Sequence, residues 1–365
     1  MVAERKVILS LKTYLRKIII VGWRYRMKGH IDKLTKNIEF EIDNKPIGAV
    51  QWDFICSIPE ATQSMINNYE QGPESAFVYL TSKCKMNCDN CTQKQGYELN
   101  VEDIEYLINN QIDKRLNYII LDGDPFQYPN IKEVIDVIKQ NNITYSINSF
   151  TEPTEEMLDY IKGSVAKIQF KMNNIDCENE YTKEVIRSLK KCKEKNIYTA
   201  IIFSIDGKNY NQIKDMIEFC KEYNVKQFSF SRLELCYKKN KYNYITQNNY
   251  LKLSKELQRI RANEDKIHIT SNDAIWKGCG ACSTTLTIMP NGDIVPCAYI
   301  NVVCGNIKDR EIDKAWKSKT FKDIRESNLE GKCGKCKYSF LCKGCRAIPF
   351  IEEKNYLGED KGCWI

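Results

Sequence analysis

The stretch Cys84-Lys-Met-Asn-Cys88-Asp-Asn-Cys91 follows closely after the apolar, strand-like run Phe77-Val-Tyr-Leu80. Three thiolates on one short loop can bind one face of a cubane iron–sulfur cluster, and they leave its fourth iron without a protein ligand. An open metal corner is typical of a site that performs chemistry, whereas a fully sealed site is structural. The same spacing taken alone also fits part of a zinc site or three separate buried thiols.

Downstream of this loop, from about residue 74 to 262, short apolar runs alternate with amphipathic segments. In the first such segment Val101, Ile104, Leu107 and Ile108 recur with helical spacing. The alternation predicts right-handed βαβ units around a parallel sheet, with functional loops at the carboxyl ends of the strands. The predicted strands are 77–81, 118–122, 143–148, 165–172, 198–205 and 226–232, and the predicted helices are 101–110, 131–139, 155–161, 183–193 and 213–223.

A second cysteine-rich region occupies residues 279–363. Because a closed 4Fe–4S cluster takes four thiolates, eight of the nine cysteines there would complete two such clusters. Paired C-x2-C knuckles also build zinc ribbons, so zinc is the alternative from spacing alone. The eight are Cys279, Cys282, Cys297, Cys333, Cys336, Cys342, Cys345 and Cys363.

The first motif resembles the cluster loop of the radical S-adenosylmethionine (radical SAM) enzymes, and the later cysteines resemble the SPASM extension of radical SAM peptide maturases. The resemblance covers about residues 76–365 and departs at Cys342 and Cys345, where C-x3-C is common in place of C-x2-C. It implies an α/β fold with a partial (β/α)6 barrel, a C-terminal SPASM iron–sulfur domain and a small N-terminal α+β segment. The expected boundaries are 1–75, 76–262 and 263–365.

The resemblance also implies roles for individual residues. Cys84, Cys88 and Cys91 would hold the catalytic 4Fe–4S cluster, whose open iron chelates the amino and carboxylate groups of SAM. The turn Asp122-Gly123-Asp124 resembles the family's Gly-Gly-Glu-Pro motif, with Asp122 in place of the first Gly and Asp124 in place of the Glu. A plain Asp-Gly turn is the alternative.

By position at strand ends, Asn148, Ser204 and Arg232 are expected to contact SAM, although Arg232 suits a structural ion pair equally well. The family pattern assigns Cys279, Cys282, Cys297 and Cys345 to auxiliary cluster I. It assigns Cys333, Cys336, Cys342 and Cys363 to auxiliary cluster II. The remaining cysteines are interpreted as core or helix-face thiols: Cys56, Cys177, Cys192, Cys220, Cys236 and Cys304.

Composition supports a cytoplasmic iron–sulfur protein. The seventeen cysteines are odd in number, and eleven of them fall in the two motifs, which indicates metal clusters in a reducing compartment rather than disulfides. We expect no signal peptide and no membrane span, because no long apolar run is present. The net charge of +7 suggests an anionic partner, yet three clusters would offset about five charges. We therefore expect no nucleic-acid partner.

The resemblance implies reductive cleavage of SAM to a 5′-deoxyadenosyl radical, which modifies a ribosomally synthesised peptide by a thioether or carbon–carbon crosslink or a related change. The expected partners are a precursor peptide and a small electron donor such as flavodoxin or ferredoxin. Residues 38–42 and 49–54 predict a strand pair and residues 59–69 a helix, so residues 1–75 suit either a leader-peptide module or a barrel cap.

Two other functions remain open from the sequence. A sulfatase-maturase-like enzyme would form formylglycine, but that group carries a carboxylate after the cysteine that matches Cys297, where this chain has Ala298. A non-catalytic iron–sulfur electron carrier would not cleave SAM.

Overall fold

The computed structural model of the protein describes residues 28–32, 37–42, 45–51, 71–84, 96–110, 115–232, 245–264, 266–271 and 278–363. Within these residues, no helix combines the length and the apolar character needed to cross a membrane.

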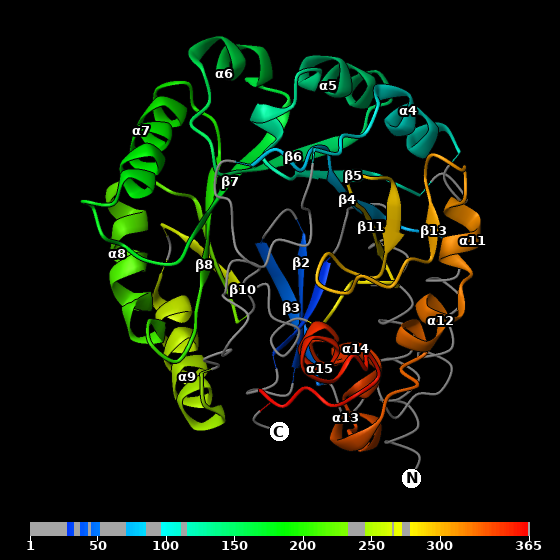
Figure 1. Ribbon diagram of the computed structural model, residues 1–365. Helices are drawn as coiled ribbons and strands as arrows, with labels where there is room; N and C mark the ends of the chain where they lie inside the picture. The colour runs from blue at the N-terminus through cyan, green and yellow to red at the C-terminus, as the bar shows by residue number, and fades with distance from the viewer. Residues whose placement is uncertain are drawn as a thin grey trace, which may run out of the picture.

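A ten-stranded sheet organises most of the chain, in the order β10-β9-β8-β7-β6-β5-β4-β11-β12-β13. The strands from β10 to β11 run parallel, and β12 and β13 are antiparallel to their neighbours. The sheet is strongly curved and forms an open barrel (Figure 1). The strands are β4 (Ser75–Tyr79), β5 (Tyr118–Asp122), β6 (Thr144–Ser149), β7 (Val165–Met172), β8 (Thr199–Ser204), β9 (Gln227–Ser231), β10 (His268–Ser271), β11 (Thr285–Ile288), β12 (Asp293–Val295) and β13 (Gly305–Asn306).

Six helices cover the outer side of the curved sheet (Figure 1). The predicted alternation of strands and helices is confirmed, and α7 begins earlier than expected because the Asn179 side chain accepts the N–H groups of Tyr181 and Thr182 and caps the helix. The helices are α4 (Val101–Asn109), α5 (Ile131–Gln140), α6 (Glu155–Ile161), α7 (Glu180–Glu194), α8 (Ile213–Glu222) and α9 (Gln247–Asn263).

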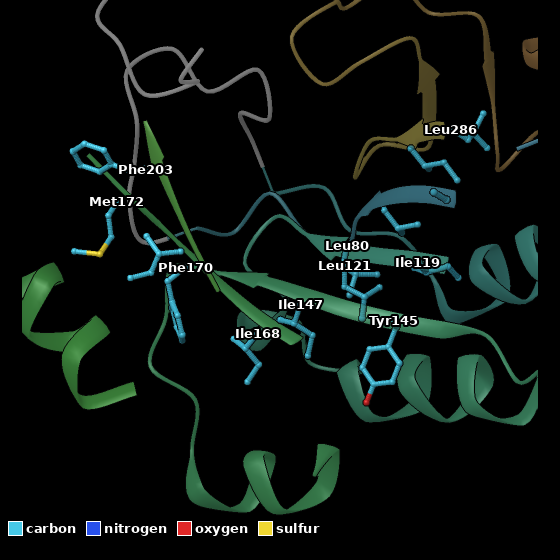
Figure 2. Close-up of a cluster of buried hydrophobic side chains, with 14 of the residues drawn as sticks. Leu80, Ile119, Leu121, Tyr145, Ile147, Ile168, Phe170, Met172, Phe203 and Leu286 are labelled. Carbon is cyan, nitrogen blue, oxygen red and sulfur yellow. The ribbon is translucent and has the colours of Figure 1, made fainter. Parts of the chain in front are cut away.

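Side-chain alternation along β5, β6 and β7 separates a core from a polar inner face. Figure 2 shows Tyr145, Ile147 and Ile168 pointing from the sheet toward the helices that cover it. Because successive side chains point to opposite faces of a strand, Gln169 and Lys171 of β7 lie on the inner face of the barrel. The core thus fixes the sheet while the inner face carries groups that can bind polar ligands.

The N-terminal part differs from its prediction. It forms a three-stranded antiparallel sheet in the order β1-β2-β3, not a strand pair. The unpredicted strand, Lys28-Gly-His-Ile-Asp32, has one strongly apolar residue and gives no period-two pattern. The strands are β1 (Lys28–Asp32), β2 (Asn37–Ile42) and β3 (Lys45–Gln51). The predicted helix at 59–69 lies outside the described residues.

The C-terminal part adds short helices after β13, which lie beside the open edge of the barrel (Figure 1). Strands β11 and β12 join this part to the barrel, because β11 pairs in parallel with β4. The helices are α11 (Ile312–Trp316), α12 (Lys319–Arg325), α13 (Gly331–Lys335), α14 (Ser339–Cys342) and α15 (Ala347–Glu353). The last three carry or flank four of the cysteines of the second group.

Candidate functional site

The first cysteine motif starts at the carboxyl end of β4. Cys84 is partly exposed there, whereas Cys88 and Cys91 lie outside the described residues. The start of this loop adjoins the turn after β5, because the Leu80 N–H donates to the Asp122 carbonyl over 3.1 Å.

Hydrogen bonds close the base of the same loop. The Ser82 N–H donates to the Tyr97 carbonyl over 2.9 Å, and the Tyr97 N–H donates back to the Ser82 hydroxyl over 2.8 Å. Thr81 donates to the Glu98 carboxylate over 3.1 Å. These contacts fix both ends of the cysteine loop next to the barrel.

The turn after β5 is tied to the loop after β6. Gly123 and Asp124 both have left-handed backbone, with φ of 78° and 61°, a conformation that favours Gly, Asn and Asp. The buried Asp124 carboxylate accepts hydrogen bonds from the Ser149 hydroxyl (2.9 Å), the Phe150 N–H (3.2 Å) and the Thr151 hydroxyl (2.6 Å). Since a carboxylate has about four acceptor positions, the three donors found among the described residues leave one for a further donor.

Asp122 is the centre of a polar network on the inner face. Its carboxylate accepts from Asn148 Nδ2 over 2.7 Å and pairs with Lys171 Nζ over 3.3 Å. Gln169 Nε2 donates to Asn148 Oδ1 over 2.9 Å. The network spans the carboxyl ends of β5, β6 and β7. Sequence reasoning missed Lys171 and Gln169, although the alternation along residues 165–172 places both on one face.

Ser204 and Arg232, two residues expected to contact SAM, lie at the ends of β8 and β9. Ser204 is buried, and its carbonyl accepts from Asn209 Nδ2 over 2.9 Å. Arg232 is also buried and pairs with Asp360, with Nη2 to Oδ2 at 2.8 Å and Nη1 to Oδ1 at 3.3 Å. Its guanidinium carbon lies 5.0 Å from the centre of the Tyr250 ring. Arg232 thus takes part in a structural ion pair, which is one of the two roles that the sequence left open for it.

Asp360 connects this ion pair to the second group of cysteines. Its carboxylate also accepts the N–H groups of Cys345 (2.9 Å) and Gly362 (3.0 Å). Burial acts to raise the pKa of Asp360, but the Arg232 guanidinium, the Cys345 N–H and the Arg346 guanidinium together outweigh it, so the pKa is lowered. The carboxylate thus stays charged, and no local sequence pattern identified it.

Three of the four cysteines expected at auxiliary cluster I lie close together. Burial raises the pKa of Cys282 well above its usual range, and the nearby thiols of Cys279 and Cys304 raise it further. Burial raises the pKa of Cys297 to about 12, and Cys279 again adds to it. Cys304, which the sequence left among the core thiols, therefore also lies near Cys282.

Buried cations surround these thiols. Lys343 is 2 % exposed, and its ammonium donates to the Ser283 hydroxyl. Burial lowers the pKa of Lys343 to about 8, against the opposing effect of Cys279 and Cys282. Arg325 Nε donates to the Cys282 carbonyl over 2.9 Å. Since a buried cation needs an anionic neighbour, this environment suits thiolates.

At the cysteines expected for auxiliary cluster II, N–H groups are directed at sulfur. The Gly344 N–H donates to Cys342 Sγ over 3.3 Å, and the Asp360 N–H donates to Cys333 Sγ over 3.4 Å. Lys343 and Gly344 have φ of 55° and 60°. Two successive left-handed residues make the tight turn that the shortened C-x2-C spacing requires.

The donor set fits iron–sulfur clusters. All eight cysteines of the second motif are free thiols, and both N–H···S bonds and buried cations stabilise anionic clusters. Among the described residues, no three His, Cys, Asp or Glu side chains already stand around a metal position.

Comparison with known proteins identifies two domains in the chain. Residues 78–220 match the radical SAM superfamily, and residues 279–345 match the SPASM iron–sulfur cluster-binding domain. A heme synthase of Oleidesulfovibrio alaskensis, named as AdoMet-dependent, is 33% identical over 113 residues, which are 29% of each chain. The mycofactocin maturase MftC of Mycobacterium tuberculosis is 32% identical over 91 residues, which are 23% of each chain. The matched part thus spans less than a third of these relatives.

Solved structures share the fold over most of the chain. SuiB of Streptococcus suis bound to its precursor peptide SuiA has a TM-score of 0.65 at 18% identity, covering 97% of this chain and 89% of SuiB. The protein anSMEcpe with bound AdoMet has a TM-score of 0.63 at 18% identity, covering 80% of this chain and 90% of that one.

These matches confirm the predicted fold class and cofactors. A radical SAM domain takes a 4Fe–4S cluster and SAM, and a SPASM domain binds auxiliary iron–sulfur clusters. Both matches lie inside the expected barrel and C-terminal ranges. The chain therefore contains a radical SAM domain at residues 78–220 and a C-terminal SPASM domain at residues 279–345.

Proposed function

We propose that the protein reductively cleaves SAM and uses the resulting 5′-deoxyadenosyl radical to modify a ribosomally synthesised peptide. The observation that carries the proposal is the position of Cys84. It lies on a loop closed at its base by Ser82 and Tyr97, at the carboxyl end of the first barrel strand. The turn of Asp122, which resembles the SAM-binding motif of the family, adjoins that loop.

In this proposal Cys84, Cys88 and Cys91 hold the SAM-binding cluster, which when bound supplies the electron that cleaves SAM. Asp124 has one acceptor position left for the SAM ammonium. Asp122 and Gly123 shape the turn, and the Asp122–Lys171 pair keeps the inner face near neutrality. Asn148 and Ser204 are further proposed SAM contacts on the same inner face, and they orient SAM while the barrel excludes water.

Arg232 has a structural role in this proposal. Its guanidinium is bound to Asp360, so we assign it to holding the C-terminal segment at the mouth of the barrel. A direct contact with the SAM carboxylate would require it to share its donors. Eight cysteines of the C-terminal part hold two auxiliary clusters, in the two sets of four that the family pattern implies.

A peptide substrate is supported by the relatives. SuiB shares the fold and has been solved with a precursor peptide, and MftC is named as a maturase. The sheet β1-β2-β3 has two edge strands, and an extended leader peptide can bind such an edge by adding a strand. The electron donor is proposed to be a small protein such as flavodoxin or ferredoxin.

Formylglycine formation is a weaker candidate. The cysteine that matches the family position, Cys297, is followed by the buried Ala298, which cannot act as a base. The shared fold with anSMEcpe does not distinguish the two reactions. Incubation with sulfatase-derived Cys or Ser peptides, analysed by mass spectrometry, would separate them.

The decisive test is SAM cleavage by the full chain after anaerobic cluster reconstitution. With dithionite, the protein should release 5′-deoxyadenosine, measured by chromatography. The triple variant Cys84→Ala, Cys88→Ala and Cys91→Ala should release none, whereas Cys192→Ala, a buried core thiol, should match the natural protein. If the natural protein with loaded clusters released no 5′-deoxyadenosine, the electron-carrier alternative would replace the proposal.

A further inference from the structure

Arg346 is a buried cation without a carboxylate partner. It is 2 % exposed, and Nη1 donates to the carbonyls of Gly358 (2.5 Å) and Tyr356 (3.3 Å). Its Nε is buried and has no hydrogen-bond partner within the part of the chain that the structure describes. No described carboxylate lies at ion-pair distance from this guanidinium. Asp360 interacts with it only from a longer distance and is already paired with Arg232, so a further anion beside Arg346 would be stabilised.

The remaining polar contact of Arg346 is to a cysteine. Nη2 donates to Cys333 Sγ over 3.4 Å, and the Asp360 N–H donates to the same sulfur over 3.4 Å. Cys333 is one of the four cysteines assigned to auxiliary cluster II. It therefore receives one neutral and one positively charged donor.

The backbone of the neighbouring turn makes this contact possible. A Cβ on Gly344 would lie 2.7 Å from Arg346 Nη2 and 3.3 Å from Cys333 Sγ. Only glycine leaves room for the guanidinium and the sulfur to meet. The turn at the shortened spacing between Cys342 and Cys345 thus allows Arg346 to lie beside Cys333.

We propose that Arg346 is the counter-cation of the auxiliary cluster held by Cys333, Cys336, Cys342 and Cys363, and that it raises the reduction potential of this cluster. The inference rests on the proposed assignment of these cysteines. One-electron reduction makes the cluster more negative, so a fixed cation and an N–H···S bond at one thiolate stabilise the reduced form. The unpartnered Nε provides a further donor for a cluster sulfur. Arg346 is a positioning residue here, because it acts through the cysteine and not on the substrate.

The test is a redox titration followed by electron paramagnetic resonance. It uses the full chain carrying Cys84→Ala, Cys88→Ala and Cys91→Ala, so that only auxiliary clusters contribute to the spectrum. In this background Arg346→Gln should lower the midpoint potential of one cluster by at least about 59 mV, which is a tenfold change in the reduced-to-oxidised ratio. Arg346→Lys should restore part of the shift. Lys354→Gln should change nothing, since Lys354 is an exposed lysine that ends α15.

The outcomes separate the inference from the function on which it rests. An unchanged potential in Arg346→Gln with its iron retained would overturn the inference alone. Loss of about four irons from Arg346→Gln but not from Arg346→Lys would support the counter-cation, and loss from both would show a role in packing instead. Zinc in place of iron at these cysteines would overturn both the cluster assignment and the inference.

Discussion

The Arg232 guanidinium and the Asp360 carboxylate form a buried ion pair, with Nη2 and Oδ2 2.8 Å apart although the two residues are 128 positions apart in the chain. Arg232 follows the last strand of the predicted barrel, and Asp360 precedes Cys363 by a short turn. Because Asp360 also accepts the Cys345 N–H, its carboxylate links a proposed cluster ligand to the barrel.

Breaking this pair should destabilise the protein strongly. Asp360→Asn leaves Arg232, whose side chain is 3% exposed, without its counter-charge, and such a loss costs about 3–5 kcal/mol. Urea denaturation of the loaded protein measures it. The control is Asp313→Asn, which removes an exposed pair with Lys317 at 3.1 Å and should cost less than about 1 kcal/mol. Equal losses in the two variants would contradict a structural role for the buried pair.

Gly344→Ala should remove iron from the C-terminal domain. The new Cβ would meet Arg346 Nη2 at 2.7 Å in a residue with φ of +60°, so either the guanidinium or the turn between Cys342 and Cys345 must shift, and both adjoin Cys333. We expect about four irons fewer per chain than the natural protein binds, measured by iron analysis after anaerobic reconstitution.

Gly163→Ala is the matched control for that variant. Gly163 also has a left-handed backbone, with φ of +78°, but nothing lies within 4 Å of an added Cβ. The variant should lose about 1–2 kcal/mol of stability from backbone strain and keep its iron. If both variants kept all their iron, the tight contact at Gly344 would not be needed for the cluster.

The barrel was predictable because its pattern is local. In residues 165–172 apolar and polar residues alternate, and the helical segments repeat apolar residues at helix spacing. Strands β10 and β11 were missed because each has four residues, too few for a periodic pattern. Their place in the sheet depends on pairing with β9 and β4, which the sequence does not display.

The site was predictable only where residues are adjacent in sequence. The cysteine spacing identified the cluster loop and the C-terminal field. The residues that surround those cysteines come from distant segments: Asp360 meets Arg232, Lys343 meets Ser283, and Arg346 meets Cys333 across 13 residues. Such charge compensation follows from folding, and no spacing rule identifies it.

Cys279, and not Cys304, should complete auxiliary cluster I. Both thiols lie near Cys282, but Cys279 also lies near Cys297, whereas Cys304 interacts with Ser318 and Thr320. Cys279→Ala should therefore lower the iron content by about four per chain, from about twelve to about eight. Cys304→Ala should leave it at about twelve. The reverse result would move the fourth ligand to Cys304.

Asp124 should contribute to SAM binding through its remaining acceptor position. Its carboxylate already accepts from Ser149, Phe150 and Thr151, so Asp124→Ala removes both a structural centre and the proposed partner of the SAM ammonium. A charge-assisted hydrogen bond contributes about 1.5–3 kcal/mol, so the Kd for SAM should rise about 10- to 100-fold. Anaerobic isothermal titration calorimetry measures it.

Thr151→Val separates the two roles of Asp124. It removes one donor to the carboxylate, at 2.6 Å, and should lower stability by about 1 kcal/mol while leaving the SAM affinity within about twofold, since it keeps the carboxylate that is proposed to bind the ammonium. If Thr151→Val weakened SAM binding as much as Asp124→Ala, the turn would act on SAM only through its shape, and Asp124 would not bind the ammonium.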